Sequence, residues 1–422
     1  MLIMDNEIFD VITKELDRQT YNIELIASEN YVSDSVLRAQ GSILTNKYAE
    51  GYPDKRYYGG CEFVDIVEKI AIERLKSLYS VDFANVQPHS GSQANTAVYS
   101  AFMDPGDAIL GLSLDKGGHL THGSPVNFSG KIYKSFFYGL DDNELINYEE
   151  IDLLASKHKP KIIVAGASAY SRAIDWEKIS ETCKKNNCLF VADIAHYTGL
   201  IAAGLYPSPV NYADIVTGTT HKTLRGPRGG FILTNNQEFS KKINSSVFPG
   251  NQGGPLMHVI AAKAVAFGEA LQPYFKTYQT NVLENAKIFS DVLNNSPLRI
   301  VSGGTDSHLI LVDLKDSPYN GKEAEKMLEK ASITVNKNTI PNDPESPFVT
   351  SGIRIGTAAI TTRGFSKDDI QSIAEFIKDI LISKHSNDNQ YLSDTSKKIK
   401  AISSKYPLFD NSNSIKNEKV VA

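Results

Sequence analysis

The sequence predicts an α/β fold in which helices cover both faces of a largely parallel sheet and a smaller α/β unit follows. Three observations support this prediction. The chain has 422 residues, more than a single hydrophobic core usually serves, so two domains are expected. Short apolar runs alternate with amphipathic stretches in the middle of the chain, as in repeated strand–helix units. Further apolar runs follow a long helical segment and indicate the second unit.

The N-terminal part combines helical and irregular stretches. Residues 1–20 alternate apolar and charged positions at helical spacing, which predicts an arm or first helix. Residues 22–60 are rich in polar residues, glycine and tyrosine, and we expect loops with short helical pieces there. Residues 61–80 repeat apolar residues every three or four positions and predict an amphipathic helix.

Five short apolar runs are candidate strands of a large domain, and helical segments separate several of them. They are residues 108–113, 161–166, 188–194, 213–218 and 229–234. Because these runs are mostly apolar, we expect a sheet that is buried on both faces. A helical segment over residues 257–275 leads out of this domain, which we place at residues 21–272.

The rest of the chain, residues 273–422, predicts a small C-terminal domain. Its candidate strands are residues 298–304, 308–314 and 332–337, and a helix over residues 366–384 closes it. From about residue 387 the sequence turns polar, so we expect a final helix and a frayed tail.

Composition and charge exclude several classes of protein. The net charge of -5 argues against a general nucleic-acid or membrane-surface binder, which needs a broad basic face. No apolar run approaches the roughly 18 residues of a membrane helix, and acids stand where a signal peptide carries bases. Cys61, Cys183 and Cys188 are too few and too irregularly spaced for a disulfide framework or a metal pair. We therefore expect a cytoplasmic protein with reduced cysteines.

Polar residues directly after three of the apolar runs are the first candidates for function, because open α/β sheets bind ligands at the carboxyl ends of their strands. Ser168 follows residues 161–166. Asp193 and His196 lie at the end of residues 188–194 and just after it, and Thr219, His221 and Lys222 follow residues 213–218. Taken singly, each has an ordinary alternative, since most lysines are solvated and an aspartate at a strand end often caps a turn or helix.

Asp193 and Lys222 together meet the needs of pyridoxal phosphate. The lysine amine forms a Schiff base with the cofactor, and the carboxylate keeps the pyridine nitrogen protonated, so that the ring accepts electrons from a substrate carbanion. The phosphate of this cofactor has a candidate site at residues 90–95, where an extended segment ends and a helix begins. Backbone amides at a helix start and serine hydroxyls suit a dianion, although an ordinary helix N-cap is the alternative.

Long motifs over most of the chain, from about Ile23 to Leu381, resemble the serine hydroxymethyltransferase family. They are ELIASENY, LTNKYAEGYP, KRYYGGCE, QPHSGSQAN, GGHLTHGSPVNFSG, DIAH, TTHKTLRGPRGG, FPGNQGGPLMH, TVNKN, PNDP, SPFVTSGIRIGT and TRGF. The resemblance implies pyridoxal phosphate fold type I, with a seven-stranded sheet in the large domain. It also implies reversible transfer of the serine hydroxymethyl carbon to tetrahydrofolate, giving glycine and 5,10-methylenetetrahydrofolate.

The resemblance also implies roles for individual residues. Lys222 would hold the cofactor, Asp193 would contact its pyridine nitrogen, and His119 would stack on its ring. Further cofactor contacts would come from Ser168, His196, Thr219 and His221, and phosphate contacts from Ser90, Gly91 and Ser92, with Tyr48 and Gly254 of a partner subunit. The last two residues imply a homodimer with shared active sites.

Substrate contacts follow from the same resemblance. Arg354 would bind the substrate carboxylate, since a guanidinium suits a planar bidentate contact. Ser28 and Tyr58 would lie beside the substrate, and Glu50 would carry a proton for the serine hydroxyl or the folate. The folate would meet Leu114, Gly118, Leu120, Asn338, Ser346, Pro347 and Phe348.

Two departures from the family pattern and three rival functions remain. Gly218 stands where the family usually has threonine, and Ala358 stands where proline is common. The rivals are a folate-independent aldolase for β-hydroxy amino acids, a catalytically silent binding protein on the same fold, and a metal site at His119 and His122. We expect no metal, because neither cysteine nor further histidine accompanies this pair at ligand spacing.

Overall fold

A seven-stranded sheet forms the centre of the large domain. The computed structural model describes residues 5–383 and 388–408. The spatial order of the strands is β4 (Phe83–Asn85), β10 (Gly230–Thr234), β9 (Ile215–Thr219), β8 (Leu189–Asp193), β7 (Ile162–Ala165), β5 (Ala108–Leu112) and β6 (Lys134–Tyr138). Strand β10 runs antiparallel to both of its neighbours, and the other pairs are parallel. The predicted α/β fold and all five predicted strands of this domain are confirmed.

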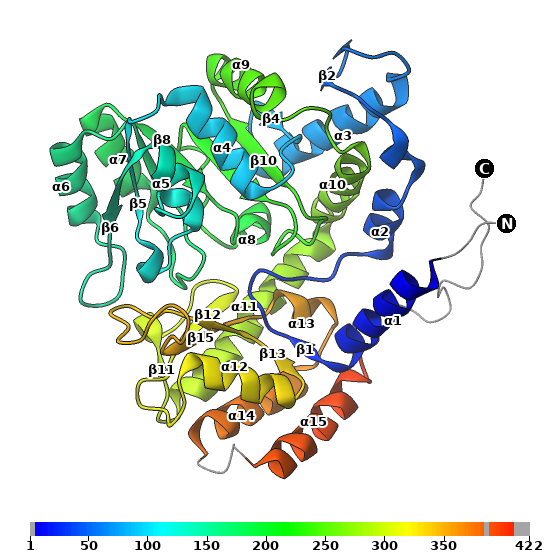
Figure 1. Ribbon diagram of the computed structural model, residues 1–422, viewed down its shortest axis with the longest axis vertical. Helices are drawn as coiled ribbons and strands as arrows, with labels where there is room; N and C mark the ends of the chain where they lie inside the picture. Colours follow the sequence, from blue (N-terminus) through cyan, green and yellow to red (C-terminus); the bar gives the residue numbers. More distant parts are fainter. Residues whose placement is uncertain (1–4, 384–387, 409–422) are drawn as a thin grey trace.

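Alternating side chains of the strands build a hydrophobic core on each face of this sheet. In β7, Ile162 and Val164 point to one core and Ile163 and Ala165 to the other, as the period of two in a strand requires. Figure 1 shows helices on both sides of the sheet. They are α3 (Glu62–Tyr79), α4 (Gly91–Phe102), α6 (Tyr148–His158), α7 (Trp176–Asn186), α9 (Gln237–Ser245) and α10 (Met257–Ala270).

The helical segment predicted over residues 257–275 consists of two helices. The first, α10, ends at Ala270, and α11 (Pro273–Asn294) begins two residues after Leu271. Proline has no backbone N–H and its ring clashes with the carbonyl four residues earlier, so Pro273 begins a helix and cannot continue one. Helix α11 then carries the chain into the small domain (Figure 1).

The small domain has its own four-stranded sheet, in the order β11 (Arg299–Ile300), β12 (Leu309–Asp313), β15 (Gly352–Gly356) and β14 (Asn336–Asn338). Helices α12 (Gly321–Lys330), α14 (Lys367–Ile382) and α15 (Asn389–Ser403) surround it. Strand β1 (Ile23–Glu24) pairs with β13 (Ile333–Thr334), and the side chains of Ile23 and Leu25 lie in the small-domain core. The boundary near residue 272 remains a prediction.

Shorter elements complete the described chain. The first helix, α1 (Asn6–Tyr21), packs against α15. The predicted irregular stretch contains α2 (Asp34–Gln40), η1 (Ile43–Asn46) and the paired strands β2 (Gly51–Tyr52) and β3 (Lys55–Arg56). The remaining pieces are η2 (Leu114–Lys116), η3 (Leu120–His122), α5 (Phe128–Ile132), α8 (Thr198–Ala202), η4 (Ser246–Asn251), η5 (Val301–Gly303) and α13 (Ala358–Thr362).

The C-terminal tail and possible membrane helices are the subject of two further sequence predictions. Most of the predicted polar tail, residues 409–422, lies outside the described residues. None of the helices in the described part of the chain has the length and apolar character that crossing a membrane requires.

Candidate functional site

The ends of strands β7, β8 and β9 meet at a cavity of about 330 Å³, here called the Lys222 cavity. Twelve of the predicted residues line it: Ser28, Ser90, Gly91, Ser92, His119, Ser168, Asp193, His196, Thr219, His221, Lys222 and Arg354. His122, Ala167, Ala195 and Arg228 also line it and were not among the predicted site residues. The structure therefore brings together residues that lie more than 300 positions apart in the sequence.

Backbone and side-chain contacts fix the segment that carries Lys222. The carbonyl of Lys222 accepts a hydrogen bond from the Asn30 amide (2.8 Å). On either side of it, Thr219 Oγ1 donates to the Ala195 carbonyl (3.0 Å) and Thr223 Oγ1 donates to the His196 carbonyl (2.9 Å). These bonds tie the turn after β9 to the turn after β8, so the lysine keeps its place relative to Asp193.

The Lys222 side chain is a buried amine. Burial lowers the pKa of Lys222 to about 7, and the positive charges of Arg354 and Arg228 act in the same direction, while Asp193 opposes them. Within the described part of the chain, no hydrogen-bond partner of its Nζ is found. A large fraction of this amine is therefore neutral and nucleophilic near pH 7.

Asp193 is a buried carboxylate with three hydrogen-bond donors. Burial alone would raise the pKa of Asp193, but the hydrogen bonds and charges around it hold that pKa well below its usual range. Its Oδ2 accepts from Asn95 Nδ2 (2.8 Å) and lies 3.1 Å from His122 Nε2, and its Oδ1 accepts from the Ala195 amide (3.0 Å). The carboxylate is thus ionised and can hold a proton on a partner nitrogen.

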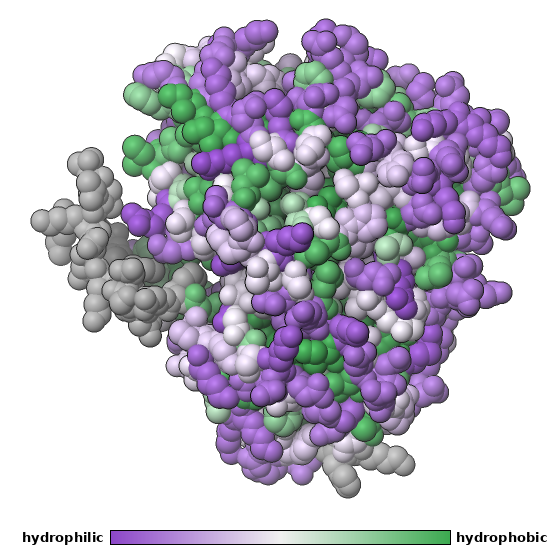
Figure 2. Space-filling view, turned by 180° about the vertical axis from the view of Figure 1, so that it is seen from behind, coloured by the Kyte–Doolittle hydropathy of each residue, from purple (hydrophilic) through white to green (hydrophobic). Residues whose placement is uncertain are grey.

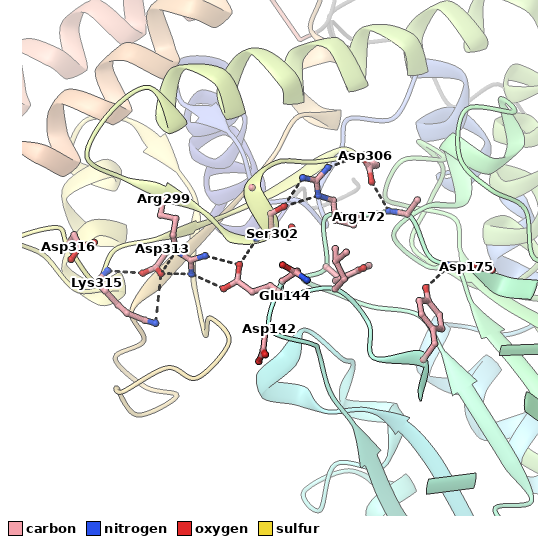
Figure 3. Close-up of a pocket in the computed structure, with 16 residues that line it drawn as sticks. Asp142, Glu144, Arg172, Asp175, Arg299, Ser302, Asp306, Asp313, Lys315 and Asp316 are labelled. Carbon is pink, nitrogen blue, oxygen red and sulfur yellow. Dashed lines mark hydrogen bonds and ion pairs between the residues drawn. The ribbon is translucent and has the colours of Figure 1, made fainter. Parts of the chain in front are cut away.

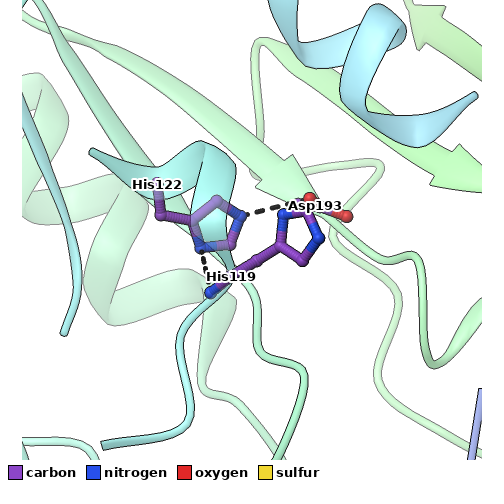
Figure 4. Close-up of side chains that lie close together, drawn as sticks. All are labelled: His119, His122 and Asp193. Atoms are coloured by element: carbon purple, nitrogen blue, oxygen red, sulfur yellow. Dashed lines mark hydrogen bonds and ion pairs between the residues drawn. The ribbon is translucent and has the colours of Figure 1, made fainter. Parts of the chain in front are cut away.

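His119, His122 and Asp193 lie close enough for a metal site, with ligand atoms within 4.8 Å of one another (Figure 4). Hydrogen bonds already engage both nitrogens of His122, Nδ1 of His119 and both carboxylate oxygens of Asp193, however. His122 Nδ1 accepts from the His119 amide (3.4 Å) while Nε2 faces Asp193, and His119 Nδ1 lies 2.7 Å from Thr121 Oγ1. A metal ligand needs a free lone pair, so the geometry favours a hydrogen-bond chain over a metal centre.

His119 and His221 are neutral imidazoles of the cavity wall. Burial lowers the pKa of His119 to about 4; the neighbouring His122 and Lys222 act in the same direction, and Asp193 opposes them. Burial, Lys222 and Arg228 lower the pKa of His221 to about 3. An uncharged imidazole can lie against an aromatic ring without desolvating an ion.

Arg354 enters the cavity from strand β15 of the small domain. Its Nη1 donates to the Ser168 carbonyl (2.6 Å) and its Nε donates to Asn336 Oδ1 (3.2 Å). Burial lowers the pKa of Arg354 to about 10, so it stays charged at neutral pH. Because two contacts use only two of its five N–H groups, the remaining donors can bind a carboxylate.

The segment before α4 can cradle an anion. Ser90 caps this helix by accepting from the Gln93 amide (3.1 Å), so the N-cap predicted as an alternative is present. A Cβ atom at Gly91 would lie 2.7 Å from Thr219 Cγ2, so only glycine allows this close approach. The buried Nδ1 of His221 has no hydrogen-bond partner within the described residues. These features fit a ligand with a phosphate and further polar groups.

A second cavity of about 350 Å³, here called the Asn338 cavity, adjoins the first, because His119 and Ser168 line both. Of the residues predicted to bind folate, Leu114, Gly118, Leu120, Asn338 and Pro347 line it. Ser346 and Phe348 do not line it, although they flank Pro347, and Phe348 is 82% exposed. A molecule in the Asn338 cavity can thus reach a ligand in the Lys222 cavity.

Four predicted residues lie elsewhere in the single chain and form their own cluster. Tyr48 Oη donates to Glu50 Oε1 (2.9 Å), and the rings of Tyr48 and Tyr58 are 5.2 Å apart. Gly254 packs against the Tyr48 ring, which a Cβ atom there would approach to 3.0 Å. None of the four lines the Lys222 cavity of its own chain.

The larger cavity between the two domains, about 910 Å³, offers less chemistry (Figure 3). Several of its charged side chains pair with one another, as Arg299 does with Glu144 (2.8 Å) and Asp313 (2.7 Å). Arg172 bonds to the Ser302 carbonyl (2.6 Å) across the same gap. These contacts fasten the two domains together and leave the Lys222 cavity as the candidate active site.

Both departures from the family pattern fit their surroundings. Gly218 lies within β9 opposite Phe231 of β10, and a Cβ atom there would lie 2.4 Å from the Phe231 ring. The ring fills the space of the missing side chain, and the strand pairing continues through this position. Ala358 is the first residue of α13, a position that accepts alanine as well as proline.

Comparison with known proteins gives one consistent result. The family described as serine hydroxymethyltransferase matches residues 1–377. A serine hydroxymethyltransferase of Francisella tularensis subsp. novicida (strain U112) is 58% identical over 406 residues, which cover 96% of this chain and 97% of the relative. That of Endomicrobium trichonymphae is 59% identical over the same shares of both chains.

Proposed function

The chain belongs to the serine hydroxymethyltransferase family, and we propose that the Lys222 cavity is where it carries out the family reaction. It is a pyridoxal-phosphate-dependent transferase of one-carbon metabolism that interconverts serine and glycine with tetrahydrofolate as co-substrate. The observation that carries the assignment of the site is that Lys222, Asp193 and Arg354 line one cavity.

The residues of the Lys222 cavity fit the cofactor. Lys222 would attach it, Asp193 would contact the ring nitrogen, and the segment of Ser90, Gly91 and Ser92 would hold its phosphate. When bound, pyridoxal phosphate supplies an aldehyde that condenses with amines and a protonated ring that withdraws electrons from the substrate α-carbon.

Each of these side chains has a defined task in the reaction. Lys222, with its pKa lowered to about 7, is neutral often enough that its amine would hold the cofactor. Asp193 stays ionised and would keep the ring nitrogen of the cofactor protonated. Arg354 binds the substrate carboxylate and so orients the bond that breaks. The neutral His119 ring would pack against the cofactor.

The Asn338 cavity supports the folate-dependent reaction over the rival aldolase. An aldolase that needs no folate has no use for a second cavity that shares His119 and Ser168 with the first. We place tetrahydrofolate in the Asn338 cavity, where it can take up the one-carbon unit.

We also propose a homodimer in which Tyr48, Glu50, Tyr58 and Gly254 complete the Lys222 cavity of the partner subunit. They cluster away from the cavity of their own chain, and Tyr48 and Tyr58 are 53% and 50% exposed. Nearby apolar side chains on α3 are exposed too, including Phe63 and Ile66. In Figure 2, which is seen from behind, apolar side chains gather in the upper left part of the face. The half-turn between the two views brings the upper right part of Figure 1, with β2 and α3, to this place. An interface of this kind would bury them.

A cytoplasmic location and a domain boundary near residue 272 belong to the same proposal. The three cysteines are free thiols, which suits a reducing compartment. The two separate hydrophobic cores support the division into two domains, with Ile23 and Leu25 packed in the small one.

One experiment tests the proposed function. The purified protein should absorb visible light through the cofactor imine and should convert serine to glycine at a rate that depends on tetrahydrofolate. A Lys222→Ala variant should be colourless. A rate that is the same without tetrahydrofolate would point to the aldolase, and a parent protein that stays colourless and inactive with added cofactor would contradict the proposal.

A further inference from the structure

Lys263 is a lysine in the interior of the large domain with no carboxylate partner. It lies on α10, its side chain is 1% exposed, and its Nζ donates to three backbone carbonyls, those of Val86 (2.7 Å), Pro88 (3.0 Å) and Gly230 (2.8 Å). Among the residues that the structure describes, it forms no ion pair. Burying an ammonium without a carboxylate partner costs free energy. The three hydrogen bonds to backbone carbonyls offset this cost, so we expect its role to lie in the segments that they connect.

The three carbonyls select the charged form of Lys263. Burial lowers its pKa to about 7, and the carboxylate of Glu68 opposes that shift. An ammonium has three N–H donors, whereas a neutral amine has two and would direct a lone pair at a carbonyl oxygen. The ammonium is thus the form that satisfies all three contacts.

The carbonyls belong to two chain segments beside the part of the Lys222 cavity that Ser90, Gly91 and Ser92 line. Val86 and Pro88 precede the cradle that begins at Ser90, and Gly230 follows Arg228, which lines the same cavity. The Gly230 amide also donates to the Pro88 carbonyl (3.0 Å). Lys263 therefore joins both segments from behind.

Packing at this point leaves no space for adjustment. A Cβ atom at Gly230 would lie 2.3 Å from the Ser90 carbonyl oxygen. A Cβ atom at Gly229 would lie 2.4 Å from Cε of Lys263. Displacement of the lysine would be passed directly to the cradle, because tightly packed interiors transmit strain.

We propose that Lys263 is a positioning residue for the cofactor phosphate: it fixes the backbone of the anion cradle and places a positive charge behind it. The proposal rests on the location of the phosphate at Ser90, Gly91 and Ser92 given above. Lys263 lines no part of the Lys222 cavity, so it acts through the backbone and through its field.

The positive charge of Lys263 affects the pKa of histidines at and beside the cavity. The pKa of His221, which lines the cavity, is lowered first by burial and by Lys222 and Arg228, and Lys263 contributes further. After burial, Lys263 is the cause that lowers the pKa of His89, the residue before the cradle. A charge that disfavours protonation of these rings also favours a bound dianion.

The test compares pyridoxal phosphate with pyridoxal, which has the same ring and aldehyde but no phosphate. The protein freed of cofactor is titrated with each compound, and visible imine absorption gives the two dissociation constants. Lys263→Met should weaken pyridoxal phosphate binding by about tenfold or more, because the cradle loses both its backbone anchor and the positive charge behind it. Pyridoxal binding should change by less than about twofold. An equal loss for both compounds, or no loss, would overturn the proposal.

Three further variants keep the result interpretable. Gly229→Ala retains every charge but displaces Lys263, so it should give the same selective loss and serves if Lys263→Met does not fold. Lys287→Met removes an exposed lysine of α11 and should leave both dissociation constants unchanged.

Ser92→Ala tests the location of the phosphate at the cradle. If it leaves the preference for the phosphate intact, the proposed phosphate location is wrong; if it reduces that preference and Lys263→Met does not, only the role of Lys263 is wrong.

Discussion

Nε2 of His122 lies 3.1 Å from Oδ2 of Asp193, and both residues line the Lys222 cavity. Nδ1 of the same ring accepts from the His119 amide, so the ring is held at both nitrogens. Asn95 donates to the same carboxylate oxygen (2.8 Å) and accepts from Thr217 Oγ1 (2.6 Å). This chain of hydrogen bonds keeps a fully buried carboxylate ionised, which the electron-withdrawing ring of the cofactor requires.

Asp193→Asn should lower kcat by roughly 10²-fold or more, since it removes the charge that keeps the ring nitrogen protonated. His122→Leu should have a smaller effect, because Asn95 and the Ala195 amide still donate to the carboxylate. Steady-state rates with saturating serine and cofactor measure both. If His122→Leu is the more damaging change, His122 acts on the ligand directly and not through Asp193.

The rate at which the cofactor-free protein forms its imine should rise with pH, with a midpoint near 7. Only the neutral amine attacks an aldehyde, and burial together with Arg354 and Arg228 lowers the pKa of Lys222 to about 7. Arg228→Met should move the midpoint upward. Stopped-flow absorbance at several pH values provides the measurement, and a midpoint near the ordinary lysine value of about 10.4 would contradict the account.

Shared active sites predict complementation between two inactive variants. Lys222→Ala and Glu50→Gln should each be inactive as homodimers. In a mixed dimer both changes fall in one site, which leaves the other site intact, so mixing and reassembling the two proteins should restore activity. A mixture that stays inactive although mixed dimers form would show that each site is built within one chain.

Gly218→Thr should destabilise the protein by about 1–3 kcal/mol, because the new side chain meets the Phe231 ring in a fully packed core. A second change, Phe231→Val, should recover part of this loss by making room. Denaturant unfolding of the cofactor-free protein measures both variants. If Gly218→Thr alone leaves the stability unchanged, the Phe231 ring does not occupy the space that a threonine side chain needs.

The sequence predicted those strands whose residues are mostly apolar, such as Ile162–Ala165, since such runs have few other interpretations. It did not identify strand β6, whose residues Lys134–Tyr138 lie at the edge of the sheet and include a charged one. Strand β15 was also missed, because two glycines and Arg354 interrupt its apolar pattern. Arg354 was nevertheless found through the motif that it belongs to.

The same limit applies to the site. Residues at strand ends could be predicted, because the carboxyl ends of parallel strands meet at one edge of a sheet. Asn95 was placed only in the candidate phosphate segment, and Arg228 was not among the predicted site residues. Their importance lies in contacts with residues far away in the sequence, 98 positions in the case of Asn95 and Asp193. His122 was considered only as a metal ligand, and its contact with Asp193 becomes visible only in three dimensions.

The most direct test of the central claim is to reduce the cofactor-loaded protein with borohydride and to locate the pyridoxyl group by peptide mass spectrometry. Reduction converts the imine to a stable secondary amine on the lysine that carried it. We expect the label on Lys222 alone and none in the Lys222→Ala variant. Label on another lysine, or an active enzyme without label on Lys222, would contradict it.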